Sequence, residues 1–277
     1  MIDVPWKRVI SPSGCIEHND SLSQLDHWKH DFRRGSFILR KELSVRSGFL
    51  RLSYLWLVLE PLFLALVYYL VFSTLRASLN LTSLFIGLGL MMSFTRGLNS
   101  GLNIKLKDGG LMIDRVSSRA VIIGKISILF VDSIFIISGI SLVLFFFYDV
   151  EILPILLMTF LSAVIVICSH SLYSVFQPIV IMIPDTAKIL RFSGLAVFFG
   201  SPVLYPLGMT TGLHRTISLY NPFSYFVEPV RYFAINSEDV FLLIPEVALA
   251  YCLFFAILII LSIRRIEQIR WRTSTWS

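Results

Sequence analysis

The sequence predicts an all-α integral membrane protein with six transmembrane helices, an N-terminal cytoplasmic interface helix and an outer re-entrant segment between helices five and six. Hydrophobic residues make up 56% of the chain, and the mean hydropathy is +0.76, well above the values of soluble domains. A helix needs about 20 mostly apolar residues to cross the hydrocarbon core. Stretches of that kind occupy residues 54–75, 81–103, 126–148, 152–183, 192–213 and 241–263.

The distribution of positive charge predicts how these helices are oriented. Of the 24 Lys and Arg residues, 21 fall in residues 1–53, 96–125, 188–191 and 264–277, and 3 fall in the alternate loops. Because Lys and Arg are retained on the cytoplasmic side, both termini are expected in the cytoplasm. Two termini on one side require an even number of spans, in agreement with six. Basic residues at membrane edges lie near anionic lipid headgroups, so the net charge of +6 gives no reason to expect a nucleic-acid partner.

The chain is expected to divide into a cytoplasmic tail, an amphipathic interface helix, a six-helix transmembrane domain and a second cytoplasmic tail, at residues 1–35, 36–53, 54–266 and 267–277. In the interface helix, Leu39 and Leu43 share one side, and Arg40 supplies a cationic position. Such a helix lies in the cytoplasmic interface. It is either a simple flank of the first span or a docking element for a cytoplasmic partner, and its length favours docking.

The longest charged cytoplasmic loop between spans, residues 106–125, contains a short apolar strip. Two glycines at 109 and 110 end the preceding helix, and the strip with its flanking charges follows as Leu111, Met112, Ile113, Asp114 and Arg115. Exposed apolar residues on a cytoplasmic loop need a surface that buries them. The membrane surface and a protein partner are equally compatible with this loop alone.

Residues 208–239 connect the last two spans on the outer side and are too long and too apolar for a plain loop. Within them, residues 220–232 hold five aromatic rings, two prolines and the charged residues Glu228 and Arg231. Three residues apart, these two are expected to pair on one helix face, although Pro229 weakens a regular helix. Broken helices at membrane depth are tolerated when they are buried in protein or line a cavity, so a re-entrant element is expected.

Catalytic motifs are absent from the sequence. It contains no Walker A motif, no H-E-x-x-H, no G-x-S-x-G and no C-x-x-C, so no catalytic, cofactor-binding or metal-binding residue is expected on this chain. Three polar residues within the predicted spans are expected to have structural roles. Glu60 and Asp132 lie near the cytoplasmic third, where such residues snorkel or pair between helices, and His170 is expected to form hydrogen bonds between helices.

Several segments together carry a family resemblance. Residues 51–61 (RLSYLWLVLEP) resemble the signature that opens the first span of ABC exporter permeases of the second type, and capsular-polysaccharide export permeases in particular. The resemblance continues in order, through residues 97–119, Pro184-Asp185, residues 201–206 (SPVLYP) and residues 221–231. It covers about residues 35–265. The N-terminal 35 residues are longer than is usual in the family, and the loop lacks the usual proline near residues 117–118.

The resemblance implies a transport subunit and not an enzyme. Such a permease is a homodimer in the bacterial cytoplasmic (inner) membrane that binds two copies of a cytoplasmic ABC ATPase, and that partner carries the ATP and Mg. The cargo would be a lipid-linked glycan, with membrane lipids and periplasmic and outer-membrane export proteins as further candidate partners. The residues expected to couple the permease to the ATPase are Leu39, Arg40, Leu43, Leu111, Met112, Ile113, Asp114, Arg115 and Asp185.

Aromatic residues near the outer ends are candidates for a glycan path, because sugar C–H faces stack on aromatic rings. The aromatic belt at the headgroup level is the more common role of such residues. The candidates are Tyr68, Tyr69, Phe72, Tyr148, Tyr205, Tyr220, Phe223, Tyr225 and Phe226. Two other functions stay open. One is a permease of the same fold that moves lipid-linked O-antigen, teichoic acid or another lipid or drug; the other is a six-span membrane enzyme such as an acyltransferase.

Overall fold

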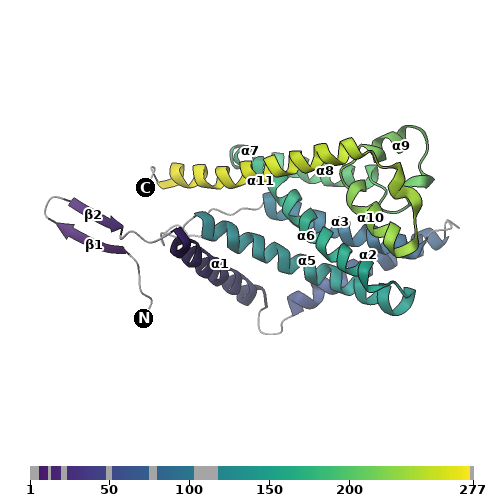
Figure 1. Ribbon diagram of the computed structural model, residues 1–277, viewed down its shortest axis with the longest axis horizontal. Helices are drawn as coiled ribbons and strands as arrows, with labels where there is room; N and C mark the ends of the chain where they lie inside the picture. Colours follow the sequence, from purple (N-terminus) through teal and green to yellow (C-terminus); the bar gives the residue numbers. More distant parts are fainter. Residues whose placement is uncertain are drawn as a thin grey trace.

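The computed structural model describes residues 6–11, 14–19, 24–47, 52–74, 80–102 and 118–274. Its long helices lie side by side along the longest axis of the molecule (Figure 1). In chain order the elements are β1 (Trp6–Ser11), β2 (Gly14–Asn19), α1 (Gln24–Ser47), α2 (Leu52–Thr74), α3 (Leu81–Leu102), α5 (Ser118–Tyr148), α6 (Ile152–Val175), α7 (Gln177–Met182), α8 (Thr186–Gly200), η1 (Leu207–Met209), α9 (Gly212–Leu219), α10 (Ser224–Ile235), η2 (Glu238–Leu242) and α11 (Pro245–Ser274).

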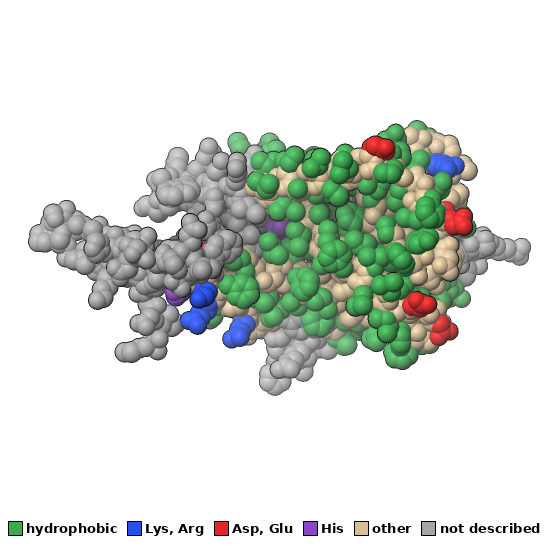
Figure 2. Space-filling model, in the orientation of Figure 1, with side chains coloured by type: hydrophobic (Ala, Val, Ile, Leu, Met, Phe, Trp, Pro, Cys, Tyr) green, Lys and Arg blue, Asp and Glu red, His purple; other side chains and the backbone are tan. Residues whose placement is uncertain are grey.

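The two ends of the helical bundle differ in charge. The N-terminal hairpin, α1 and the last turns of α11 lie at one end, which we call the basic end, and α9 and α10 lie at the other, which we call the α10 end (Figure 1). On the face drawn in Figure 2, Lys and Arg gather mainly at the basic end, Asp and Glu gather at the α10 end, and apolar side chains cover the middle. This segregation agrees with the charge pattern of the sequence.

Four described helices are long and apolar enough to cross a membrane: Leu81–Leu102, Ile123–Tyr148, Ile152–Val175 and Pro245–Ser262. They correspond to the second, third, fourth and sixth predicted spans. Much of the surface of α11 is apolar and exposed, including Leu249, Leu253 and Ile257. Because water disfavours so large an apolar surface, the chain is an integral membrane protein.

The fifth predicted span differs from the structure. The expected continuous helix over residues 192–213 is wrong, because α8 ends at Gly200 after 15 residues. Ser201 has an extended backbone, with φ −104° and ψ 151°, which is the conformation favoured before a proline such as Pro202. The fourth predicted span is also divided: α6 ends at Val175, and the short helix α7 follows from Gln177.

The first 35 residues and the C-terminus also differ from the expected tails. Strands β1 and β2 form an antiparallel hairpin in which Val9 is opposite Ile16, so the described chain is not purely helical. Helix α1 begins at Gln24, twelve residues before the predicted interface helix. At the other terminus, α11 continues to Ser274. Neither end of the chain contains a stretch of about 20 mostly apolar residues, which was the signal for the predicted spans.

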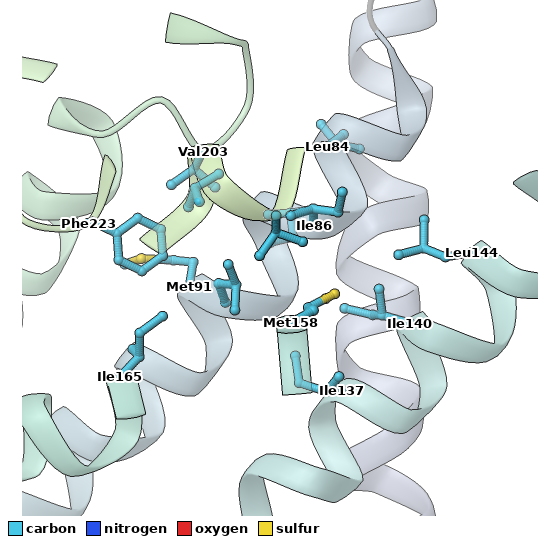
Figure 3. Close-up of a cluster of buried hydrophobic side chains, with 14 of the residues drawn as sticks. Leu84, Ile86, Met91, Ile137, Ile140, Leu144, Met158, Ile165, Val203 and Phe223 are labelled. Carbon is cyan, nitrogen blue, oxygen red and sulfur yellow. The ribbon is translucent and has the colours of Figure 1, made fainter. Parts of the chain in front are cut away.

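Helix α3 lies at the centre of the bundle and packs against α5, α6, α8 and α10. Glycine makes this close packing possible, since a Cβ atom at Gly97 would collide with the Ser169 side chain and the Val166 carbonyl of α6. Towards the α10 end, apolar side chains from α3, α5 and α6 converge with Val203 and Phe223 of the segment between α8 and α11 (Figure 3). This shared core fixes that segment to the helices.

Candidate functional site

The segment between α8 and α11, residues 201–244, folds into short helical pieces that cover the α10 end of the bundle. Helix α10 packs against α3 and α6. The turn after α8 approaches α3 so closely that a Cβ atom at Gly87 would collide with the Val203 carbonyl. A second contact joins the pieces to one another, because the Gly208 N–H donates to an Asp239 carboxylate oxygen at 2.8 Å. These contacts place α10 for the ion pair that it carries.

Arg231 is the central residue of this region, and its side chain is fully buried. Its Nη1 donates to Glu228 Oε1 at 2.9 Å, to the Pro202 carbonyl at 2.6 Å and to the Tyr205 carbonyl at 3.2 Å. Its Nη2 donates to the Val203 carbonyl at 2.9 Å and to the Ser83 carbonyl at 3.1 Å. One guanidinium therefore ties α10, the turn after α8 and the first turn of α3 together. We call this arrangement the arginine clamp.

The Glu228 side chain is also fully buried. A buried pair is stable only when its remaining donors and acceptors are also satisfied. The four carbonyls satisfy Nη1 and Nη2 of Arg231, whereas its Nε and Glu228 Oε2 have no hydrogen-bond partner among the described residues. The predicted pairing of Glu228 with Arg231 is confirmed, and α10 remains helical through Pro229.

A groove of about 650 Å³ opens between α2, α3 and α8. Its walls are almost entirely apolar, and polar side chains enter only where α3 ends and α8 begins, towards the basic end. Lys188 and Arg191 of α8 lie there, together with Thr95 and Asn99 of α3. The rest of the lining is Leu64, Tyr68, Leu88, Met91, Met92, Leu98, Phe192, Gly194, Leu195, Phe198 and Phe199. An apolar groove with a basic end is suited to an acyl or prenyl chain that carries an acidic headgroup.

The nine aromatic residues of the predicted path do not form one surface. Among those whose side chains are described, Tyr68 alone lines the groove, while Tyr69 and Tyr220 are exposed and the side chain of Phe72 lies outside the described residues. Six have a ring partner within the chain: Tyr68 with Phe198, Tyr148 with Phe85, Phe223 with Phe94, Tyr205 with His214, Tyr225 with Tyr251 and Phe226 with Phe255. Phe223 belongs to the core.

The predicted coupling residues fall into two groups. Leu111, Met112, Ile113, Asp114 and Arg115 lie outside the described residues. On α1, Arg40 is exposed, whereas Leu39 and Leu43 are half-buried. Asp185 precedes α8 at the basic end and is exposed, and it forms an ion pair with Lys188 at 2.9 Å.

The three polar residues of the predicted spans have different surroundings. Glu60 on α2 is exposed. Asp132 on α5 is buried and lies 3.5 Å from the guanidinium of Arg96 on α3, so the predicted interhelical partner exists for this residue. His170 on α6 is buried, and its backbone lies against Gly97 and Gly101 of α3. Its Nδ1 has no hydrogen-bond partner in the described part of the chain, so the expected interhelical bond is not seen at that atom.

Sequence reasoning did not identify the groove. Its lining comes from three helices, and most of those residues are ordinary apolar residues of a span. The pair Lys188 and Arg191 at the start of α8 was an available signal, because it places two cations directly before an apolar stretch. No protein-family model matches the chain, and no curated protein matches it either.

Proposed function

We propose that this chain is the membrane-spanning permease subunit of an ATP-driven exporter, which moves a capsular polysaccharide out across the cytoplasmic membrane. The groove between α2, α3 and α8 carries the proposal. Its apolar walls fit the lipid anchor of a glycan, and Lys188 and Arg191 fit an acidic headgroup. The motif order from residues 51–61 to residues 221–231 supports the same function.

The proposal includes six membrane crossings with both termini in the cytoplasm. Helix α2 packs against α3 and α5, and α8 packs against α3, so both run within the bundle. Helix α8 has 15 residues and is about 22 Å long, which is less than the ~30 Å of a bilayer core. The turn that follows it and the re-entrant α9 and α10 complete this crossing. The basic end then faces the cytoplasm.

The energy for transport comes from a separate ATPase, of which two copies bind a dimer of this chain. Closure of the ATPases moves the cytoplasmic loop at residues 111–115 and the start of α8 near Asp185. Because α8 forms one wall of the groove, its displacement changes the width of the groove. The arginine clamp keeps the other end of α8 fixed against α3. The wider groove then takes up the lipid anchor of the glycan at the basic end.

The first test uses the purified chain with and without a co-expressed ATPase. We expect no ATP hydrolysis by this chain alone and co-purification of the two proteins. The double change Leu111→Asp/Ile113→Asp should release or uncouple the ATPase, since burying an aliphatic side chain contributes about 1.5–3 kcal/mol. Met209→Asp/Leu213→Asp is the matched control, because both residues are exposed on the α10 end. ATP hydrolysis intrinsic to this chain would refute the proposal.

The second test addresses the cargo. Lys188→Gln/Arg191→Gln should reduce surface polymer several-fold, while Arg215→Gln, an exposed cation on α9, should not. A groove of this kind also accepts the anchor of lipid-linked O-antigen or teichoic acid. The glycan that disappears from the cell surface identifies the cargo. If every surface glycan persists in a strain that lacks this chain, the chain does not export a glycan.

A further inference from the structure

Helix α1 has two chemically different sides. The inner side lies against α5 at close range: a Cβ atom at Gly35 would approach Ile123 Cγ2 to 2.8 Å, and one at Gly124 would approach Ile38 Cγ2 to 2.9 Å. Both acidic residues among the described side chains of α1 are turned away from solvent, with Asp31 buried and Glu42 half-buried. The inner side therefore has its partner within the chain.

The outer side of α1 carries only cations, aromatic rings and a serine. The exposed residues between 29 and 44 are Lys29, Phe32, Arg33, Phe37, Arg40, Lys41 and Ser44. We call them the outer face of α1. Phe32 and Phe37 are 65% and 69% exposed. Because successive residues turn by about 100° around a helix, Phe32 lies at one edge of this face and Phe37 lies between Arg33 and Lys41. Exposed phenylalanine is unfavourable in water, and four neighbouring cations attract negative charge.

Chain connectivity keeps this face near the membrane. Helix α1 ends at Ser47, and α2, which packs within the bundle, begins at Leu52. Five residue steps span at most about 18 Å. Arg40 and Lys41 lie within two turns of the end of α1, at about 10 Å along the helix. A surface within reach of this face must therefore lie at the membrane edge.

We propose that the outer face of α1 binds anionic lipid headgroups at the membrane surface, with Arg33, Arg40 and Lys41 on the phosphates and Phe32 and Phe37 in the interface. This combination of basic residues and aromatic anchors is what interfacial helices use. The charge favours anionic over zwitterionic lipid. The inference does not depend on the proposed transport function, because it uses only α1 and its attachment to α5.

The binding preference is tested with the full chain reconstituted in vesicles of phosphatidylcholine with added phosphatidylglycerol. After detergent extraction, mass spectrometry measures the ratio of the two lipids that stay bound. We expect enrichment of phosphatidylglycerol, reduced in Arg33→Gln/Arg40→Gln/Lys41→Gln by roughly fivefold per cation at this site. Arg33→Lys/Arg40→Lys should retain the enrichment, and Arg215→Gln at the α10 end is the control. Equal lipid ratios in the wild-type chain and the triple variant would overturn the proposal.

The location is tested with a spin label at Ser44→Cys, after Cys15, Cys168 and Cys252 have been replaced by serine. In vesicles with phosphatidylglycerol at about 0.1 M salt, the label should be accessible to oxygen and shielded from a water-soluble nickel chelate. Salt at about 1 M shortens the screening length to about 3 Å and should restore nickel access. A label that is accessible to nickel at both salt concentrations would overturn the proposal. A label that is shielded only after the ATPase is added would also overturn it, and would assign the face to a protein partner.

Discussion

One ion pair lies within α10 and another joins α3 to α5, and the two pairs differ in how completely the protein buries them. Glu228 and Arg231 are both fully buried, with 2.9 Å between their charged atoms. Arg96 and Asp132 are 3.5 Å apart, and the Arg96 side chain remains 37% exposed. Charge attraction grows as the surrounding dielectric falls. The α10 end is therefore held by a fully buried clamp, while the half near the basic end is held by a pair that is only partly buried.

The difference indicates which end of the molecule is rigid. Besides its carboxylate partner, Arg231 binds four backbone carbonyls. Moving α10 away from α3 would therefore leave several buried polar groups without hydrogen-bond partners. Separating Arg96 from Asp132 leaves fewer enclosed polar groups without a partner, because the Arg96 side chain is 37% exposed. We expect motion during transport to occur at the basic end, where the groove has its cations and α8 begins. The substitutions below test this contrast, from the largest expected effect to the smallest.

Arg231→Ala should have the largest effect. It leaves Glu228 as an unpaired buried charge, and breaking a buried pair costs about 3–5 kcal/mol. The melting temperature of the detergent-solubilised chain should fall by roughly 10 °C, and export should fall with it. The double variant Glu228→Ala/Arg231→Ala should export better than Arg231→Ala alone, at matched membrane levels. Near-normal surface polymer in both single variants and the double would show that the clamp is dispensable.

Gly97→Ala should have the next largest effect, because it affects the packing that holds α3 and α6 together. The added methyl group would collide with the Ser169 side chain and the Val166 carbonyl, and overpacking costs about 1–3 kcal/mol. Gly200→Ala is the matched control, since a Cβ atom there has its nearest neighbours at 3.4 and 3.7 Å. The comparison is made by thermal unfolding, and equal melting temperatures for the two variants would contradict this account of α3.

Asp132→Asn should be milder than Arg231→Ala, although it too removes one partner of an ion pair. The protein encloses the Arg96 side chain only in part, so we expect a loss of about 1–2 kcal/mol. Thermal unfolding in the same detergent measures the difference. A loss of stability as large as that of Arg231→Ala would mean that the Arg96–Asp132 pair is as strongly shielded as the arginine clamp.

Asp185→Ala should leave stability nearly unchanged. Asp185 and Lys188 keep 80% and 75% of their side-chain surface exposed, and exposed pairs contribute about 0–1 kcal/mol. If Asp185 couples the permease to an ATPase, ATP hydrolysis by the assembled complex should fall while the melting temperature stays constant. A fall in melting temperature of several degrees would instead assign Asp185 a structural role.

Much of the candidate site could not be predicted, because its contacts join residues far apart in the chain. Glu228 and Arg231 are three positions apart, and their pairing followed from helical spacing. The Ser83 carbonyl, 148 residues before Arg231, has no signature in the sequence. The groove is similar, since its walls come from α2, α3 and α8. Composition placed these residues in apolar segments but did not indicate which segments are neighbours.

The sequence by itself determined that this is a helical membrane protein, that charge separates its two ends and that Glu228 and Arg231 share a helix face. These properties depend on composition and on spacing within one segment, which act locally and add along the chain. The tertiary structure alone decided that Arg231 closes on the turn after α8, that α8 ends at Gly200, and that Asp31 of α1 is buried while Lys29, Arg33, Arg40 and Lys41 are exposed. Those outcomes depend on which helices pack together, because packing selects the residues that lose water and must then find partners.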